Sequence, residues 1–334
     1  MHPSDETLRL QVRQDIETFL AEMRSRPLET QHNLKRRFIQ QLKKSPVAFN
    51  PAEANRQHYE LPTEFFQQFL GKHLKYSCCY WSPNLTALDA AEEAMLTLTC
   101  ERARLEDDTD ILELGCGWGS LSLWMADHYP KARILAMSNS HSQRAYIQAQ
   151  AQHRGLKNLS VVCADINDFA APRQFDRIVS IEMFEHVKNY EQLLARTAVW
   201  LKPAGLLFVH IFSHTDFAYP FMTENPKDWM ARTFFSGGTM PSDDLLLHFQ
   251  RDVTLVDHWR IDGTHYTKTL EAWYEKYRAR LDVIEPIIRQ TYGAEHQAQW
   301  LNNWRMFFLV CAEAFGLRSG KEYGISHYLF TKKG

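Results

Sequence analysis

Apolar residues recur at helical spacing over much of the first hundred positions. They stand three or four positions apart over 6–24 ("ETLRLQVRQDIETFLAEMR"), over 31–43 and again over 86–104. This spacing is typical of amphipathic helices. Between these stretches, Pro62 marks a turn before a short helix within 58–81, and that segment then becomes rich in aromatic residues and cysteine. The pattern predicts a helical N-terminal region.

From Asp110 onward the pattern changes to short apolar runs separated by helical stretches. The runs "DILELG", "ARILAMS" and "LSVVCAD" predict buried strands, and so do "FDRIVSIEMF" and "AGLLFVHIF". The stretches between them, such as "HSQRAYIQAQAQHRG", have helical spacing. Strands that alternate with helices through short links are typical of a parallel sheet covered on both faces. We therefore expect an α/β fold from this point.

The last third of the chain is less regular. Aromatic and turn-forming residues dominate about 213–250, and "DVTLVDHWRI" then predicts a strand. The stretch 270–315 is mostly of helical pattern and rich in tryptophan and phenylalanine, and "SHYLFTKK" predicts a final strand.

Composition and charge exclude several classes of protein. The net charge of −2 over 334 residues leaves no basic excess for a nucleic-acid backbone and no basic tail for an anionic membrane. No apolar run approaches the roughly 20 residues of a membrane span, and the charged N-terminus lacks a signal segment. Six scattered cysteines contain no C-x-x-C pair, so we expect reduced thiols, no metal site and a cytoplasmic protein.

A glycine-rich loop follows the first predicted strand. "ELGCGWGS" places Gly115, Gly117 and Gly119 between a strand and a helix, where glycine lets a ligand approach the backbone. The spacing differs from the dinucleotide fingerprint, and no phosphate-binding lysine follows. A tight turn is the structural alternative. The position at the carboxyl end of a strand favours ligand binding.

Two acids and a base follow the fourth predicted strand. "SIEMFEHVKNY" places Glu182, Glu185 and His186 at positions i, i+3 and i+4. Acids in such a place usually mark the start of a helix, because they suit its positive N-terminal end. The alternative is a site that handles protons, and the pattern alone leaves both open.

Several motifs together indicate a family. "ILELGCGWGS" resembles the S-adenosylmethionine loop of class I SAM-dependent methyltransferases. Over about residues 45–332 the chain resembles the cyclopropane-fatty-acid-synthase superfamily, and most of all its coclaurine N-methyltransferase-like branch. The motifs that carry this resemblance are "YELPTEFF", "LKYSCCYW", "SIEMFEHVKNY", "FFSGGTMPS", "HYTKTLEAW" and "FFLVCAEAFG".

The resemblance implies an architecture. A Rossmann-like, mostly parallel sheet with an antiparallel strand near the C-terminus would form the cofactor-binding domain, residues 106–334. That domain would carry a cap insertion at about 213–250 and the helices of 270–315. The helical region 1–105 would help to cover cofactor and substrate. Whether its helices also join two chains into a homodimer stays open.

The resemblance also implies positions for S-adenosylmethionine. Gly115 and Gly117 would approach its methionine part, near Ile181 and with Glu113 behind the loop. Tyr76 and Ser77 would contact its carboxylate and amino end. The ribose and adenine would lie near Ser138, Asn139, Gln143, Asp165 and Ile166. Taken singly, several of these could be core, cap or surface residues, but in this order they indicate a site. The missing acid after the second strand suits the same superfamily.

The implied reaction is methylation of a nitrogen. An aliphatic amine is mostly protonated near pH 7, so the site must attract a cation and then accept its proton. We expect His186 to be the base, with Glu182 and Glu185 orienting the ammonium and the imidazole. Lipid-cyclopropanating members usually carry a small residue in place of Glu182, whereas the N-methylating members carry glutamate.

The implied substrate is a small, aromatic or heterocyclic, benzylisoquinoline-like amine. Glu60, Phe212, Tyr219, Phe235 and Tyr266 are its predicted contacts. Aromatic residues of the cap could form a cation-tolerant wall or a structural core, and the sequence does not decide between them. They are Phe212, Tyr219, Phe221, Trp229, Phe234 and Phe235.

Two other functions stay open. A lipid-modifying enzyme is favoured by residues that match the bicarbonate pocket of cyclopropane synthases, namely Cys78, Glu185, His210 and Tyr266. In that pocket Phe212 replaces a usual isoleucine. A cofactor-binding module without catalysis would not need the acids and the base. Cys311 we interpret as a packing residue.

Overall fold

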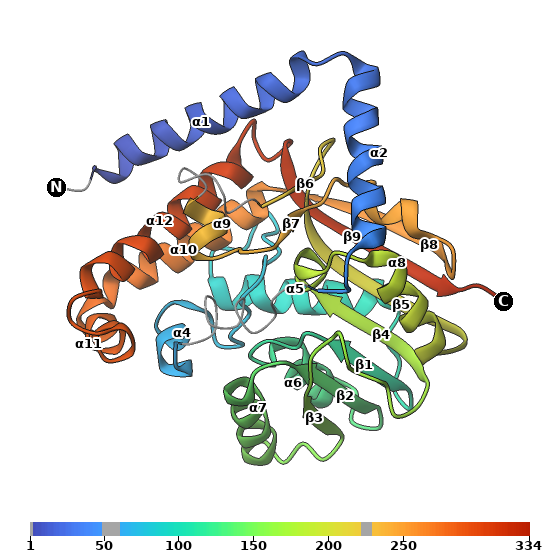
Figure 1. Cartoon of the computed structure of the whole chain (residues 1–334). Helices are drawn as coiled ribbons and strands as arrows, with labels where there is room; N and C mark the ends of the chain where they lie inside the picture. The colour runs from blue at the N-terminus through green and yellow to red at the C-terminus, as the bar shows by residue number, and fades with distance from the viewer. Residues whose placement is uncertain (1–2, 49–60, 222–228) are drawn as a thin grey trace.

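The computed structural model describes residues 3–48, 61–221 and 229–334, and within them the chain forms a seven-stranded sheet with helices on both faces (Figure 1). The strand order is β3-β2-β1-β4-β5-β9-β8. β9 runs antiparallel to both of its neighbours, whereas β1 to β5 are parallel. The predicted fold class is confirmed. The strands are β1 Asp110–Leu114, β2 Arg133–Ser138, β3 Leu159–Cys163, β4 Phe175–Ile181, β5 Leu201–His214, β8 Val253–Asp262 and β9 Tyr323–Lys332.

The inner strands are apolar because helices cover both of their faces. Every residue of β1 is buried, and so are the last five of β2. Strands of this kind read as continuous apolar runs rather than as alternating ones. The covering helices are α5 Leu88–Arg102, α6 Ser120–His128, α7 His141–His153 and α8 Tyr190–Trp200.

The segment between β4 and α8 decides one question that the sequence left open. A 3-10 turn, η1 (Phe184–His186), follows β4, and α8 begins only at Tyr190. Its cap is Asn189, whose side chain accepts a hydrogen bond from the Gln192 amide at 3.0 Å. The first turn of α8 is therefore capped without Glu182 or Glu185, and the helix-start interpretation of these acids is wrong.

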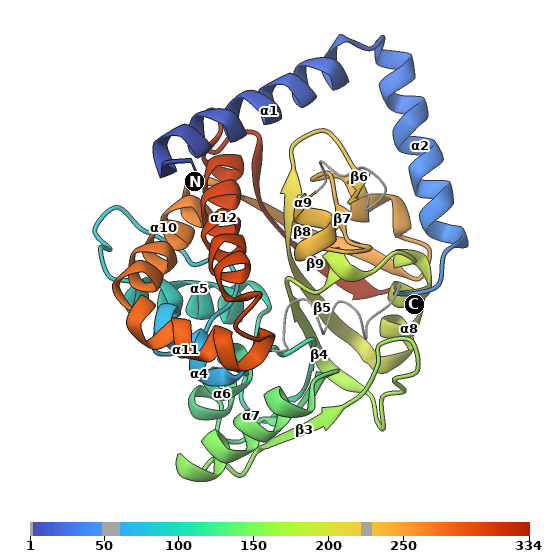
Figure 2. The same ribbon diagram turned by 60° about the vertical axis from the view of Figure 1, so that its left-hand side comes forward.

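A helical cluster stands beside the sheet in both ribbon views (Figure 2). Its core is aromatic: Phe69 packs against Trp304 and Phe308, at ring centroid distances of 6.0 and 5.3 Å. Burial of such large rings dominates the stability of this part of the fold. The helices are α4 Thr63–Phe69, α10 Thr264–Ala279, α11 Leu281–Tyr292 and α12 Gln297–Gly316.

The cap lies between β5 and β8 in sequence. It holds a two-stranded sheet, in which β6 pairs antiparallel with β7. Its described elements are β6 Tyr219–Pro220, α9 Trp229–Thr233, β7 Thr239–Met240 and η2 Leu245–Phe249.

The N-terminal helices form a bent arm over the rest of the chain (Figure 1). α1 (Asp5–Ser25) and α2 (Leu28–Lys44) are separated by Pro27. Arg9 ties α1 to Glu271 of α10 and Glu313 of α12, with distances of 2.6 and 2.7 Å between the charged atoms. Lys35 ties α2 to Asp244, with its ammonium 2.9 Å from the carboxylate.

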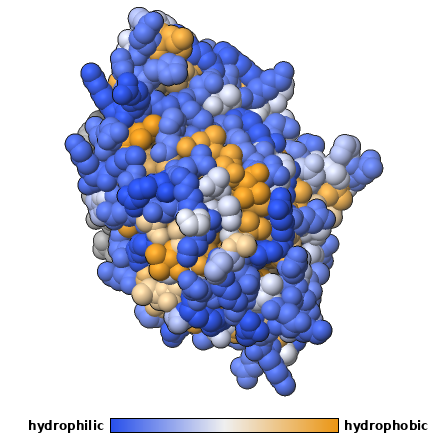
Figure 3. Space-filling view, turned by 90° about the vertical axis from the view of Figure 1, so that its right-hand side faces the viewer, coloured by the Kyte–Doolittle hydropathy of each residue, from blue (hydrophilic) through white to orange (hydrophobic). Residues whose placement is uncertain are grey.

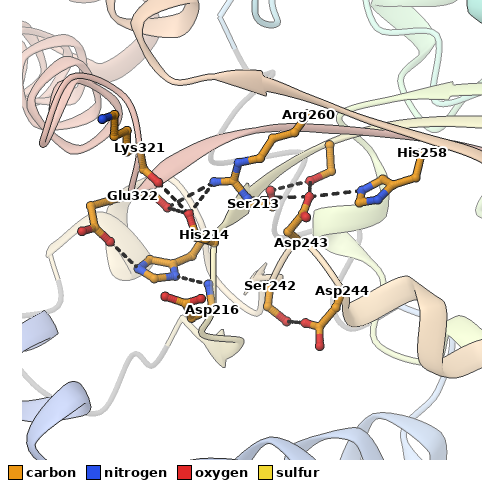
Figure 4. A network of polar contacts seen from close by, with 12 residues as sticks. Ser213, His214, Asp216, Ser242, Asp243, Asp244, His258, Arg260, Lys321 and Glu322 are labelled. Atoms are coloured by element: carbon orange, nitrogen blue, oxygen red, sulfur yellow. Dashed lines mark hydrogen bonds and ion pairs between the residues drawn. The ribbon is translucent and has the colours of Figure 1, made fainter.

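A polar network lies at the carboxyl end of β5, close to the C-terminal end of α1 (Figure 4). His214 Nδ1 accepts the amides of Asp216 and Phe217, and its Nε2 lies 3.6 Å from Glu322. Arg24 of α1 pairs with the same Glu322. The network therefore links the first helix to the central strands.

β8 forms one of the two edges of the sheet. Its pairing with β9 is interrupted by a bulge between Leu255 and Asp257, and Val256 at the bulge is 41% exposed. Hydrophobic residues form a broken band among hydrophilic ones on the face seen in Figure 3. No helix within the described residues is long and apolar enough to span a bilayer.

Candidate active site

A cavity lies at the carboxyl ends of β1, β2 and β4. Of the predicted cofactor residues, Asp165 does not line it; its Oδ1 accepts the Asn167 amide at 2.8 Å. Its lining includes Tyr76, Ser77, Gly115, Gly117, Ser138, Asn139, Gln143, Ile166 and Ile181, together with Lys75, Trp118, Glu182, Met183, His186 and Ser236.

The glycine loop gives the cavity its floor. Gly115 and Gly117 have φ angles of +78° and +52°, which L-residues with side chains rarely adopt. A Cβ at Gly117 would meet no described atom within 4 Å, whereas one at Gly115 would lie 2.6 Å from Met183. The backbone at Gly117 therefore faces open space in which a ligand could approach it closely.

Polar groups of β2 and α7 line the neighbouring wall. Ser138 Oγ donates to Gln143 Oε1 at 2.7 Å and accepts the Ser140 amide at 3.0 Å. Gln143 Nε2 is buried and makes no hydrogen bond within the described part of the chain. A buried amide donor without a partner is costly unless a ligand or water meets it. This donor is suited to a polar ligand in the cavity.

A buried acid shapes the loop that carries Tyr76 and Ser77. The Glu92 carboxylate accepts the amides of Gly71, His73 and Lys75, at 3.0, 2.8 and 3.2 Å. Burial raises the pKa of Glu92 to about 7, in spite of these bonds. Glu92 holds the loop against α5 without lining the cavity.

Lys75 is a cavity residue that the sequence analysis missed. It is 3% exposed, and its Nζ donates to Ser77 Oγ and to the Cys78 carbonyl oxygen, at 2.5 and 2.6 Å. Its signal was a single lysine inside the apolar run "HLKYSCCYW". Its ammonium near Glu182 opposes the rise that burial causes in the pKa of that acid.

The backbone turns sharply at Glu182, directly after β4. Its φ of +45° lies in the left-handed region, which costs a residue with a side chain about 1–2 kcal/mol. Strain of this kind persists where the surrounding structure imposes it. Here the Glu182 amide donates to the His210 carbonyl oxygen at 2.9 Å, and the carboxylate turns toward Tyr266 and Cys78.

The Glu182 carboxylate is surrounded by hydrogen-bonding groups. Oε1 accepts the Cys78 amide at 2.9 Å and lies 3.1 Å from His210 Nε2, and Oε2 accepts the Tyr266 hydroxyl at 2.7 Å. Burial raises the pKa of Glu182, whereas Lys75 and these bonds oppose the rise. The side chain is 10% exposed and lines the cavity.

Glu185 stands behind the cavity rather than in its lining. Its Oε1 accepts the Phe212 amide at 2.8 Å, and its Oε2 makes no hydrogen bond within the described residues. Burial and the charge of Glu182 raise the pKa of Glu185 well above its ordinary value. The pair therefore favours a neutral Glu185 beside an ionised Glu182.

His186 lines the cavity next to Glu182. Its imidazole stacks on the ring of Phe235, with centroids 4.6 Å apart and planes 27° apart. Burial and the nearby Lys188 lower the pKa of His186 to about 4, against the effect of Glu182. The imidazole is neutral at pH 7 and able to accept a proton.

Aromatic rings continue from His186 into the cap. Phe235 lies 5.6 Å from Phe212 and 5.0 Å from Phe221, and Tyr219 lies 6.1 Å from Phe221. These rings lie beside the acids and the base, but none of them is among the residues that line the cavity, and Phe212, Tyr219 and Phe221 also pack against the aromatic core.

Other predicted residues lie elsewhere. Phe234 is fully buried against Trp304, and Trp229 packs on Phe234, so these two belong to the helical core. Cys311 is packed against the same core, which agrees with a packing role. Glu60 lies outside the described residues. In the described ranges no group of histidine, cysteine or acidic side chains is arranged to hold a metal ion.

Comparisons with known proteins identify the family of this chain. The model of the family described as mycolic acid cyclopropane synthetase matches residues 48–322. (S)-coclaurine N-methyltransferase of Thalictrum flavum subsp. glaucum is 40% identical over 296 residues, which are 87% of this chain and 82% of that protein. The cyclopropane-fatty-acyl-phospholipid synthase of Escherichia coli (strain K12) is 30% identical over 268 residues, 79% of this chain and 64% of that protein.

A solved structure is similar over nearly the whole chain. It is coclaurine N-methyltransferase bound to N-methylheliamine and SAH, with 37% sequence identity and a TM-score of 0.95. The similarity covers 99% of this chain and 96% of that one.

Proposed function

The chain belongs to the mycolic acid cyclopropane synthetase family and is an S-adenosylmethionine-dependent N-methyltransferase, and we propose that it methylates a small amine on an aromatic or heterocyclic frame. The main support for this proposal is the Glu182 carboxylate, which lines the cavity together with His186 and is held by hydrogen bonds from other parts of the chain. Relatives named for the N-methylation of coclaurine and pavine support a benzylisoquinoline-like amine.

The cavity suits the cofactor. The open backbone at Gly117 and the unsatisfied donor of Gln143 offer a close approach and a polar contact. Tyr76, Ser77 and the buried Lys75 would hold the charged methionine end. S-adenosylmethionine supplies a methyl group on a positively charged sulfur.

The N-terminal region would help to enclose this ligand. Ala48 follows α2, Lys75 to Ser77 follow α4, and Leu96 and Thr99 belong to α5; all of them line the cavity. We therefore propose that residues 1–105 cover the ligand and that residues 106–334 form the cofactor-binding domain.

Glu182 would select the acceptor. An aliphatic amine arrives mostly as an ammonium ion, and an anionic oxygen in a site of low dielectric attracts it strongly. The donors around the carboxylate favour its ionised form and so oppose the effect of burial, which raises the pKa of Glu182. Phe212, Phe221 and Phe235 would enclose the apolar frame and exclude water.

His186 would take the proton. Its imidazole is neutral at pH 7 and lines the same cavity as Glu182. Its low pKa means that it would pass the proton on to solvent rather than retain it. The deprotonated nitrogen then has the lone pair that methyl transfer requires, held in line by Glu182 and the aromatic wall.

A lipid-modifying activity is the second candidate. Cys78, His210 and Tyr266 match the residues that hold bicarbonate in cyclopropane synthases, and this match favours it. In this chain, however, the same groups contact the Glu182 carboxylate. Glu182 thus supplies the anion that a lipid-cyclopropanating member would take from solution, which favours the amine.

An assay with labelled S-adenosylmethionine tests the proposal. The enzyme is incubated either with a panel of cyclic secondary amines and benzylisoquinolines or with vesicles of unsaturated phospholipid. We expect label in the amine and loss of that label in Glu182→Gln. Glu64→Gln, the same change on an exposed helix, should retain full activity. Label in the lipid alone would overturn the assignment.

A further inference from the structure

A line of hydrogen bonds leads away from Glu182 on the side opposite the cavity. His210 Nε2 lies 3.1 Å from Glu182 Oε1, and His210 Nδ1 lies 2.9 Å from His327 Nε2. His327 Nδ1 lies 2.8 Å from the Arg102 guanidinium. The line passes from β4 through β5 and β9 to the end of α5.

The two histidines are placed by the sheet itself. His210 and His327 are direct cross-strand partners in the antiparallel pair of β5 and β9, so their side chains lie on the same face. Both are fully buried, and the ring of Phe208 packs edge-on against His327 at 5.0 Å. The Arg102 guanidinium lies over the Trp259 ring at 5.0 Å, which fixes the outer end.

Arg102 sets the direction of every bond in the line. A guanidinium only donates, so His327 Nδ1 must accept and the proton of His327 must lie on Nε2. That proton is donated to His210 Nδ1, and so the proton of His210 must lie on its own Nε2. His210 therefore donates to Glu182 Oε1. A second proton on either ring would place two donors against each other.

We propose that Arg102 and His327 are positioning residues that lock His210 into the Nε2–H tautomer and thereby keep Glu182 an ionised acceptor for the ammonium. This inference rests on the proposed role of Glu182. In the other tautomer His210 would accept at Nε2, and Glu182 could meet it only as a protonated, neutral acid. Such an acid would lose its attraction for a cation.

Other ionisable groups also face this line. Around Glu182 they are Lys75, Cys78, Glu185, His186, Tyr266 and Cys311, and around Arg102 and His327 they are Tyr80, Glu101, Asp257 and His258. None of them is changed by the variants below, so a shift in the pH profile reports on the line itself.

Two variants remove a hydrogen-bonding group from the line, and two matched variants keep one at the same position. Arg102→Met removes the donor that sets the direction, and His327→Leu removes the link. Arg102→Lys keeps a donor, and in His327→Gln the amide oxygen accepts from Arg102 while its NH₂ group donates to His210. Arg36→Met, on the exposed face of α2, is the control.

Two readouts follow. In Arg102→Met and His327→Leu we expect the acid limb of kcat/KM for the amine to move to higher pH, with a loss of about 10-fold at pH 7, the value of one hydrogen bond to a charged group. Arg102→Lys and His327→Gln should recover most of it. Long-range ¹⁵N–¹H spectra of the holoenzyme should show His210 as the Nε2–H tautomer, which becomes mixed in Arg102→Met.

The outcomes separate this inference from the proposed function. If the wild type methylates amines while both broken variants keep its pH profile and its His210 tautomer, the inference is wrong. If the wild type methylates no amine, the proposed function fails, and the spectra still decide whether Arg102 sets the tautomer. Equal losses in broken and repaired variants, with unchanged pH limbs, would show a merely structural role and refute it.

Discussion

Replacing Glu182 by glycine should separate stability from activity. Glu182 adopts a φ of +45°, and glycine removes the cost of about 1–2 kcal/mol that this conformation imposes on other residues. Against this gain stands the loss of the bonds from Cys78, His210 and Tyr266. Removal of the side chain would leave these donors facing a volume that opens into the cavity, where water can meet them, so the loss is largely compensated. We expect the free energy of unfolding to change by less than about 1 kcal/mol.

Catalytic activity, in contrast to stability, should fall strongly in Glu182→Gly. In the proposed complex the carboxylate would make a charge-assisted contact with an ammonium in a site of low dielectric, and such a bond contributes about 1.5–3 kcal/mol. Its loss in Glu182→Gly corresponds to a decrease in kcat/KM of roughly 10- to 100-fold, with the affinity for S-adenosylhomocysteine retained. Denaturation in urea, calorimetry and initial rates on an amine measure the three quantities.

The same variant allows a chemical rescue. Three donors that converged on one carboxylate remain around the vacated volume, and they suit a small anion such as formate or bicarbonate. Formate should restore part of the lost rate in a saturable manner in Glu182→Gly. Glu182→Gln fills the volume and should show no rescue. Wild-type rates in Glu182→Gly, or equal stimulation of both variants, would refute the reasoning.

Three further predictions concern other residues. His186→Ala should lower kcat by about 100-fold or more because the proton acceptor is lost, while calorimetry should show unchanged cofactor binding and His153→Ala, on an exposed helix end, should be silent. Glu92→Gln should weaken S-adenosylhomocysteine binding about 10-fold by releasing the loop of Tyr76, and an unchanged Kd would contradict its bracing role. Because burial lowers the pKa values of His186 and His214 to about 4, below the unfolded value near 6.5, these groups bind more protons in the unfolded chain, and their contribution to the free energy of unfolding should fall as the pH decreases from 6.5 to 4. Glu92, whose pKa burial raises to about 7, contributes in the opposite sense, so the test is a difference: the urea profile of His214→Gln should lose part of this decrease relative to the wild type, and two parallel profiles would contradict it.

The sheet could be predicted because its strands are buried on both faces. Runs such as 110–114 and 133–138 are mostly apolar and buried almost throughout, and their order in the sequence already implied parallel neighbours. The family motifs selected Ser138 and Gln143, and the structure places both in the lining of the cavity. These features depend on local pattern or on a resemblance that spans the whole domain.

The surroundings of Glu182 could not be predicted in the same way. Cys78, His210 and Tyr266 are up to 188 positions apart, and only the fold brings them to one carboxylate. The resemblance grouped them as an anion pocket without showing that Glu182 itself fills it. The left-handed backbone that turns this side chain inward has no signature in the sequence.

In the cap insertion, two neighbouring phenylalanines have different surroundings that the sequence could not distinguish. Phe234 is buried against Trp304, whereas Phe235 stacks on His186. The segment has no regular period, so the sequence could not assign one ring to the core and the next to the site. The role of the acids near α8 was ambiguous for a related reason, since the residue that caps the N-terminus of this helix is Asn189, several positions after them.

A crystal structure of the enzyme with S-adenosylhomocysteine and a methylated amine product would test the central claim most directly. The account predicts the amine nitrogen about 3 Å from a Glu182 carboxylate oxygen, facing the sulfur and next to His186. A nitrogen held by other groups, with the Glu182 side chain turned away from it, would contradict the account.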